Sequence, residues 1–118
     1  SNHMVASAQA WPIVWPEVRA ILYGRTIAAY NAEFDLRMMR QSHQKFNLPW
    51  RENFDWVDVM ALFSEYKGDW DPFRRSYKFH RLAEAGRHFG ISLQNAHRSS
   101  ADSLLTRAVL HSIAGIPY

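Results

Sequence analysis

Cysteine is absent from the 118 residues, and its absence excludes several kinds of protein at once. Without thiols there is no disulfide framework, no thiolate metal site and no cysteine nucleophile. Cysteine-free chains fit a reducing compartment, so we expect a cytoplasmic location. No apolar run approaches the ~20 residues of a membrane-spanning helix, and no basic stretch followed by an apolar block opens the chain. The sequence therefore predicts neither a membrane segment nor a signal peptide.

The composition suits one small folded domain. Hydrophobic residues make up 47% of the chain, which is enough for a single core at this length. Ser1–Met4 is polar and without pattern, so we interpret it as an expression remnant and assign residues 5–118 to one domain. The formal net charge of +3 is a mild basic excess that is compatible with polyanionic partners.

Apolar spacing and helix-stop residues predict a mostly helical chain with one or two short strands. Five helices are expected: Pro16–Tyr23, residues 32 to about 45 after Asn31, residues 59–66 after an Asp58 cap, His80–Phe89, and Ser100 or Ala101 to about Ala114. Thr26–Tyr30 and Phe54–Val57 are the expected strands. Lys67–Ser76 mixes acids, bases and aromatic residues, and we expect an irregular functional or mobile loop there.

Two groups of polar residues are candidates for chemistry. Asn31–Asp35 runs from a strand end into a helix, which would direct Asp35 toward the space beyond the carboxyl end of the strand. His97 precedes Asp102 by five positions, and Asp102 is expected in the first turn of the last helix. Two carboxylates about 5 Å apart repel by about 3 kcal/mol at an effective dielectric constant of 20, so a site that gathers them binds divalent cations or shifts a pKa. Each aspartate alone also fits the role of a helix cap or dipole partner.

The sequence Asn-Ala-Glu-Phe-Asp at Asn31–Asp35, followed by the His97–Asp102 spacing, resembles the second and third motifs of the DEDDh 3′-5′ exonucleases. This family includes proofreading exonucleases and RNase T and has an RNase H-like fold. Elements between the motifs agree with the family: Trp56–Met60 matches its short strand leading into a helix, and Leu82–Ile91 matches its helix before the third motif. The resemblance covers about Trp11 to Ala114.

The resemblance implies metal-dependent hydrolysis of phosphodiester bonds at the 3′ ends of DNA or RNA, with two Mg²⁺ or Mn²⁺ ions in the family's site. Asp35 and Asp102 would be metal ligands, and His97 would be the general base. The residues implied to contact the nucleic acid are Asn31 and Phe34, around the terminal nucleotide, and Arg37 and Arg98, at phosphates. For both arginines, a solvated surface role is an equal alternative.

The first motif of the family, a strand bearing Asp-x-Glu, is missing from these residues. Residues 1–30 contain one acid, Glu17, and no Asp-x-Glu occurs anywhere in the chain. We therefore expect an α/β chain with an incomplete, N-terminally truncated RNase H-like fold that is mostly helical because the leading strands are absent. Since Mg²⁺ demands near-ideal geometry, loss of two of four carboxylates predicts no or very poor exonuclease activity.

A strand without its sheet neighbours leaves unpaired backbone groups, and association can repair such an edge. We expect a homodimer, with Trp11–Trp15 near the interface, or supply of the missing strand in trans; packing of these tryptophans on the monomer core is the alternative. His43, His80, His88 and His111 are expected to be exposed or partly buried. A non-catalytic nucleic-acid-binding or assembly module is the alternative function.

Overall fold

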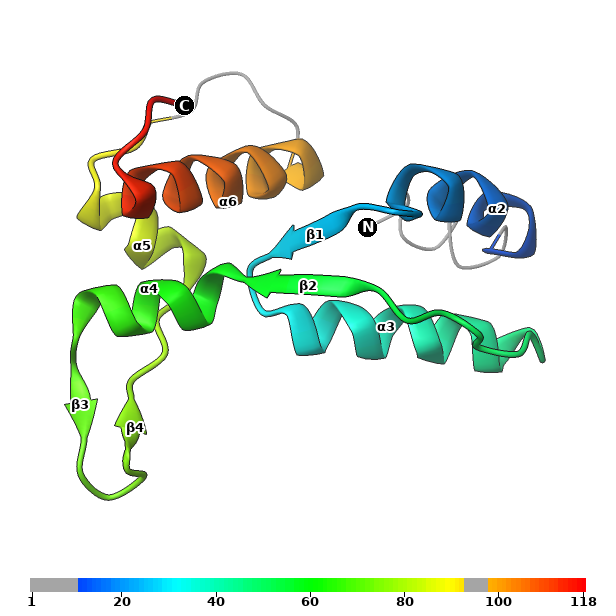
Figure 1. The fold of residues 1–118 in the computed structure, drawn as a ribbon, viewed down its shortest axis with the longest axis horizontal. Coiled ribbons are helices and arrows are strands. Elements are labelled where there is room, and N and C mark those ends of the chain that lie inside the picture. The colour runs from blue at the N-terminus through cyan, green and yellow to red at the C-terminus, as the bar shows by residue number, and fades with distance from the viewer. Residues whose placement is uncertain (1–10, 93–97) are drawn as a thin grey trace. The chain divides into compact units, whose positions relative to one another are not determined.

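The computed structural model describes residues 11–92 and 98–118. These residues form α2 (Trp11–Leu22), β1 (Thr26–Ala29), α3 (Ala32–Lys45), β2 (Asp55–Asp58), α4 (Val59–Lys67), β3 (Trp70–Asp71), β4 (Ser76–Tyr77), α5 (Leu82–His88) and α6 (Arg98–Ala114). The described chain is therefore a mixed α/β protein dominated by helices, as expected (Figure 1).

β1 and β2 are the two strands that the sequence predicted. They are neighbours in one two-stranded sheet, and their arrows point the same way in Figure 1. Asp58, at the end of β2, is the predicted cap of α4, because its side chain accepts a hydrogen bond from the Met60 backbone N–H. Gly68 ends this helix with a left-handed backbone, φ 71°, and donates its N–H to the Ser64 carbonyl.

Packing divides the chain into two compact units. The first contains the described residues up to Ile27 together with Glu33–Trp56, and the second contains Ala28–Ala32 together with Val57–Tyr118. Each unit has its own cluster of packed side chains, and the two clusters differ in chemistry.

An aromatic cluster organises the first unit. The buried Trp15 ring lies 5.4 Å from Trp11, 5.7 Å from Trp50 and 4.6 Å from His43, measured between ring centroids. His43 is 2% exposed, and its Nδ1 accepts a hydrogen bond from Trp11 Nε1 at 3.1 Å. The expectation that His43 would be exposed or partly buried is therefore wrong. The indole rings of Trp11 and Trp15, which precede it in the chain, and of Trp50, which follows it, enclose the imidazole.

The same cluster explains why α2 differs from its prediction. The helix includes Trp11 and contains Pro16 in its interior, whereas we expected it to begin at Pro16. Trp11 and Trp15 are four residues apart, so a helix through both puts the two rings on one face. Pro12 lies in the first turn of α2, where a missing N–H breaks no helical hydrogen bond.

An apolar core organises the second unit. Val59, Phe63, Ala85 and Val109 are buried and come from α4, α5 and α6. Gly86 allows α5 to approach α6 closely, since a Cβ atom at this position would lie 3.0 Å from Leu105 Cδ1. This core contains no ionisable side chain among its buried members.

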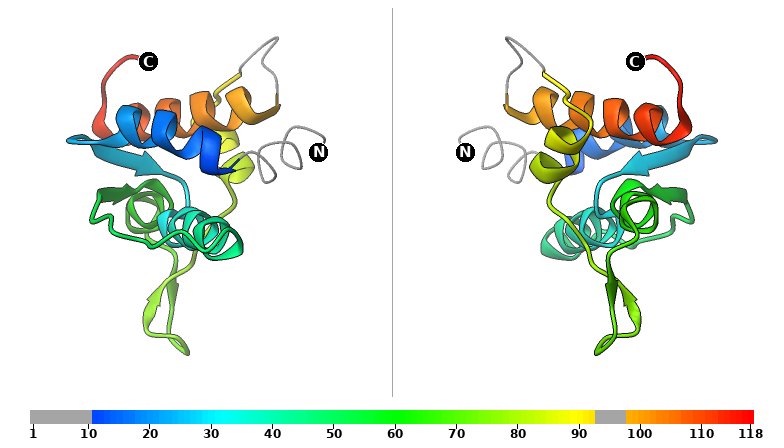
Figure 2. Two further views of the ribbon diagram at one scale, coloured as in Figure 1. Left: turned by 90° about the vertical axis from the view of Figure 1, so that its right-hand side faces the viewer. Right: turned by 90° about the vertical axis from the view of Figure 1, so that its left-hand side faces the viewer.

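The segment that we expected to be irregular contains an antiparallel hairpin, β3–β4, in which Trp70 pairs with Tyr77 and Asp71 pairs with Ser76. Within the second unit it projects away from the end of α4 (Figures 1 and 2). The prediction failed because two residues per strand are too few to show an alternating pattern. None of the helices in the described ranges has the length and apolar character that a bilayer crossing requires.

Candidate functional site

The candidate site begins where β1 passes into α3. Asn31 lies at this junction with a left-handed backbone, φ 72°, which asparagine tolerates better than most residues. Its backbone N–H donates to Asp58 Oδ1 at 3.0 Å, and the same oxygen accepts the Met60 N–H at 3.1 Å. One carboxylate oxygen therefore joins the residue after β1 to the start of α4.

Tyr30, directly after β1, makes a second hydrogen bond that fixes the end of this strand. Its hydroxyl donates to the backbone carbonyl of His80, just before α5. Burial of the Tyr30 ring, with the Glu84 and Asp58 carboxylates nearby, raises the pKa of this hydroxyl to about 12. The group is therefore a neutral donor throughout the neutral pH range.

His80 is held from several directions. Its Nδ1 lies 3.2 Å from Glu84 Oε2, and this hydrogen bond lowers the pKa of the Glu84 carboxyl. Its ring packs edge-on against Phe63, with centroids 5.7 Å apart. Nε2 is buried and has no hydrogen-bond partner within the described residues. His80 thus belongs to the framework around the junction.

Asp35 lies in the first turn of α3, as the sequence predicted, and it is exposed within the first unit. Phe34 is also exposed, and the guanidinium of Arg37 lies 5.9 Å from the centre of its ring. The first two turns of α3 therefore present a carboxylate, an aromatic ring and a guanidinium in close succession along the chain.

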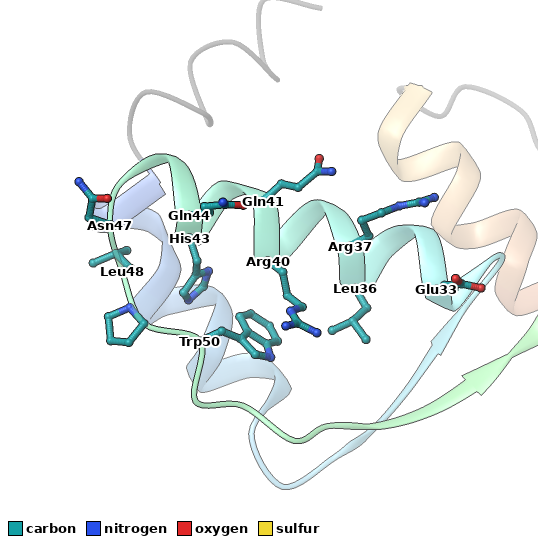
Figure 3. A pocket seen from close by; sticks show the side chains of 11 residues that line it. Glu33, Leu36, Arg37, Arg40, Gln41, His43, Gln44, Asn47, Leu48 and Trp50 are labelled. Atoms are coloured by element: carbon teal, nitrogen blue, oxygen red, sulfur yellow. The ribbon is translucent and has the colours of Figure 1, made fainter.

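A groove of about 820 Å³ follows α3 and the segment after it in the first unit (Figure 3). Arg37 lines this groove, and the Arg40 side chain extends toward Trp50. The remaining lining residues are Glu33, Leu36, Gln41, His43, Gln44, Asn47, Leu48 and Pro49. With two guanidinium groups and three side-chain amides against one carboxylate, the lining favours a polar or anionic ligand.

Of the residues predicted for the third motif, Asp102 lies in the last helix, α6 (Arg98–Ala114). His97 falls in residues 93–97, outside the described residues, and Arg98 is the first residue of α6. Asp102 is exposed, and its backbone carbonyl accepts the Thr106 hydroxyl at 2.8 Å. Because α6 begins two or three residues earlier than predicted, Asp102 lies past the first helical turn, and that detail of the prediction is wrong.

The predicted metal ligands are of the right chemical kind. Asp35 and Asp102 offer carboxylate oxygens, which Mg²⁺ and Mn²⁺ prefer. Over residues 11–92 and 98–118 there is no group of three or more His, Cys, Asp or Glu side chains arranged to hold a metal ion. Asp35 belongs to the first unit and Asp102 to the second. A complete coordination sphere for a hard cation needs further oxygen ligands than these two residues supply.

Sequence reasoning assigned Asp58 only to capping α4 and missed its second hydrogen bond, to Asn31. It also missed the bond from Tyr30 to His80. The sequence does hold a signal for the hydrogen bond between Asn31 and Asp58. Both predicted strands lead directly into helices, so the carboxyl ends of the strands would meet if the strands were parallel neighbours. The second partner is 50 residues away along the chain, and no local pattern reports it.

Comparison with known proteins adds two relatives. The chain is 28% identical over 121 residues to the "uncharacterized exonuclease CP81" of Escherichia phage 186, covering 97% of this chain and 61% of the phage protein. It is 29% identical over 108 residues to the "3′-5′ exonuclease DinG" of Staphylococcus haemolyticus (strain JCSC1435), covering 91% of this chain and 11% of that protein. No family profile and no solved structure matches. The chain thus spans less than two thirds of either relative, and over nearly all of its own length it is similar to proteins named as exonucleases.

Proposed function

We propose that this chain is an exonuclease-type domain for metal-dependent hydrolysis of phosphodiester bonds at nucleic-acid 3′ ends, built on part of an RNase H-like fold. The observation that carries the proposal is the Asn31–Asp35 junction at the end of β1, in a chain similar over nine tenths of its length to two proteins named as exonucleases. The 3′-5′ direction is named for one of these relatives.

In this proposal Asp35 and Asp102 hold Mg²⁺ or Mn²⁺, and His97 takes a proton from the attacking water. A bound divalent cation would supply Lewis-acid stabilisation of the scissile phosphate. Asn31 and Phe34 border the terminal nucleotide, and Arg37 and Arg98 bind phosphate oxygens through charge-assisted hydrogen bonds. The bond from Asn31 to Asp58 supports this arrangement, because it holds the backbone that leads into the first turn of α3.

The 118 residues contain no Asp-x-Glu sequence, so we propose that they turn over little substrate by themselves. The missing carboxylates would come from a strand outside these residues, either in a longer chain or in a partner chain. A homodimer is the other way in which the sheet edge of β1 could be completed. Light scattering of the purified chain measures its oligomeric state, and a monomer would contradict the homodimer.

The direct test uses 5′-labelled single-stranded DNA and RNA oligonucleotides with Mn²⁺ or Mg²⁺, read as product ladders on a gel. We expect slow shortening from the 3′ end with Mn²⁺, none with EDTA, and none in the Asp35→Asn or Asp102→Asn variants. Glu33→Gln is the matched control, because it removes another exposed acid from the same turn of α3 and should retain the activity. Rapid turnover that survives Asp35→Asn would contradict both the assigned ligand and the expected weakness.

A second candidate is a non-catalytic nucleic-acid-binding module, favoured by the absence of a three-ligand group in the described residues and by the arginine-lined groove on α3. Salt-dependent DNA binding that survives Asp35→Ala and Asp102→Ala, without a response to metal, would favour this function. Calorimetric titration with Mn²⁺ separates the two candidates, since only the exonuclease-type site predicts binding that depends on Asp35.

A further inference from the structure

The β3–β4 hairpin is stabilised largely by its own residues. The Lys78 N–H donates to the Asp69 carbonyl at 2.8 Å, next to the Trp70–Tyr77 pair. At the tip, Asp71 Oδ1 accepts the Phe73 N–H at 3.0 Å and the Arg74 N–H at 3.3 Å. The connection between its strands is therefore an ordered turn.

Aromatic side chains on this hairpin are exposed. The Trp70 and Tyr77 rings meet across the strands edge to face, 5.2 Å apart, and Trp70 is 51% exposed. Phe73 at the tip is 98% exposed, and Phe79, just after β4, is also exposed. Exposed large apolar side chains gathered on one small element indicate a binding surface, because isolated exposure is common but clustering is not.

Positive charge is concentrated on the hairpin together with the residues that flank it, Lys67 at the end of α4 and Arg81 before α5. Residues 67–81 contain five Lys or Arg and two Asp, so this segment alone accounts for a formal charge equal to the +3 of the whole chain. Asp69 lies 4.0 Å from Lys78, and Asp71 lies 4.0 Å from Arg74 while accepting the two N–H groups of the turn. Both acids are thus engaged within the hairpin. The Arg74 side chain is still 85% exposed and Arg75 is also exposed, so both guanidinium groups are accessible to a phosphate.

We propose that the β3–β4 hairpin is an arm that binds single-stranded nucleic acid, with Phe73 and Trp70 stacking on bases and Arg74 and Arg75 contacting phosphates. Aromatic rings interleaved with arginine or lysine are the chemistry by which proteins bind single strands with little sequence preference. Aromatic residues and arginine are also enriched at protein interfaces, so a second copy of this chain is the competing occupant that the test below must distinguish. This inference goes beyond the proposed hydrolysis, since it concerns binding by an element that carries none of the proposed catalytic residues.

The test measures binding of the whole chain to fluorescein-labelled single-stranded DNA and RNA by fluorescence anisotropy, in EDTA so that hydrolysis does not contribute. We expect salt-dependent binding of both, and an increase in Kd of about tenfold for Phe73→Ala, as expected for one lost stacking contact. Arg74→Ala/Arg75→Ala should weaken binding and reduce the slope of log Kd against log salt by about 1.4, since each phosphate contact to a single strand contributes about 0.7.

Two controls keep the outcome unambiguous. Arg25→Ala/Arg51→Ala also removes two charges, from exposed positions in the first unit, and should leave Kd within about twofold of wild type. Thermal unfolding by circular dichroism should be unchanged in Phe73→Ala, because an exposed tip residue contributes little to stability.

An unchanged Kd in both hairpin variants, or no binding by the wild-type chain, overturns the proposal. It is also overturned if the variants leave nucleic-acid binding intact but convert a dimer to a monomer in light scattering, since the hairpin would then contact a second copy. Failure here is separate from failure of the proposed hydrolysis, which depends on metal and Asp35 and is measured on product ladders.

Discussion

The two compact units differ in where they place polar groups. The first unit surrounds His43 with indole rings, so a polar side chain lies at the centre of its packing. The second unit has an apolar core of Val59, Phe63, Ala85 and Val109. The polar side chains buried there, Ser64 and Thr106, donate to carbonyls of their own helices.

This difference has an energetic consequence. A buried apolar core gains free energy roughly in proportion to the apolar area removed from water. A cluster built around a polar side chain also depends on keeping that group hydrogen-bonded, because an unpaired buried donor costs about 1–3 kcal/mol. The stability of the second unit should therefore fall most when a buried apolar side chain is truncated. The stability of the first unit should fall most when a buried hydrogen bond is removed.

The largest effect is expected from Phe63→Ala in the second unit. Phe63 is 1% exposed, and truncation of a buried phenylalanine costs about 3–5 kcal/mol, a large fraction of the stability of a small domain. Urea unfolding followed by far-UV circular dichroism measures the loss. The matched control is Phe73→Ala, which removes the same atoms from an exposed position and should change stability by less than about 0.5 kcal/mol.

Tryptophan emission shows whether the first unit unfolds together with the second unit when Phe63→Ala destabilises the second. Four of the five tryptophans lie in the first unit, and Trp70→Phe removes the one in the second. In that background, an emission midpoint that stays higher than the circular dichroism midpoint in Phe63→Ala would mean that the units unfold separately. Equal losses from Phe63→Ala and Phe73→Ala would contradict the assigned core.

A smaller loss, about 2–4 kcal/mol, is expected from Asp58→Ala. This change removes the acceptor for both the Asn31 and the Met60 N–H groups. Loss of the helix-cap bond to Met60 costs about 1 kcal/mol, and loss of the bond from Asn31 to a charged acceptor costs about 1.5–3 kcal/mol. Asp58→Asn retains an oxygen at this position and should lose less than half as much. Equal destabilisation by Ala and Asn, measured by urea unfolding, would show that Oδ1 does not hold the two groups.

His43→Phe tests the polar centre of the first unit, with an expected loss of about 1–3 kcal/mol. The ring is kept, but the Trp11 indole N–H loses its acceptor. The double variant Trp11→Phe/His43→Phe removes both partners and should recover part of the loss in a double-mutant cycle. Additive losses, followed by tryptophan emission, would mean that the hydrogen bond contributes nothing to the cluster.

The smallest effect, about 1 kcal/mol at neutral pH, is expected from Tyr30→Phe, which removes the bond to the His80 carbonyl. In the wild-type chain, the contribution of Tyr30 to the free energy of unfolding also depends on pH. Unfolded tyrosine ionises near pH 10, whereas burial raises the folded pKa of Tyr30 to about 12. The folded state therefore retains the proton that the unfolded state releases, so this contribution is constant below about pH 9 and is lost between about pH 10 and 12.

Urea midpoints measured across that range should fall more steeply for wild type than for Tyr30→Phe. Parallel pH profiles for the two proteins would show that another group is responsible for the alkaline loss.

Local features of the fold were predictable because they depend on a few neighbouring residues. The Asp58 cap and the strand that begins at Thr26 are both present. Asp35 lies in the first turn of its helix for the same reason.

Features that depend on distant partners were not predictable. The start of α2 depends on rings that pack around His43, and the β3–β4 hairpin depends on pairing across a turn with only two residues in each strand. Asp102 lies past the first turn of α6, because the helix extends further toward its amino end than the apolar pattern does.

By itself the sequence determined the existence of the helices and of strands β1 and β2, and it carried the two motifs that resemble an exonuclease. Only the tertiary structure decided which polar groups are enclosed or shared: His43 meets an indole 32 residues away, and Asp58 holds an N–H 27 residues away. Caps and glycine stops act within one helical turn, whereas burial of a polar group depends on partners that only the folded chain brings together.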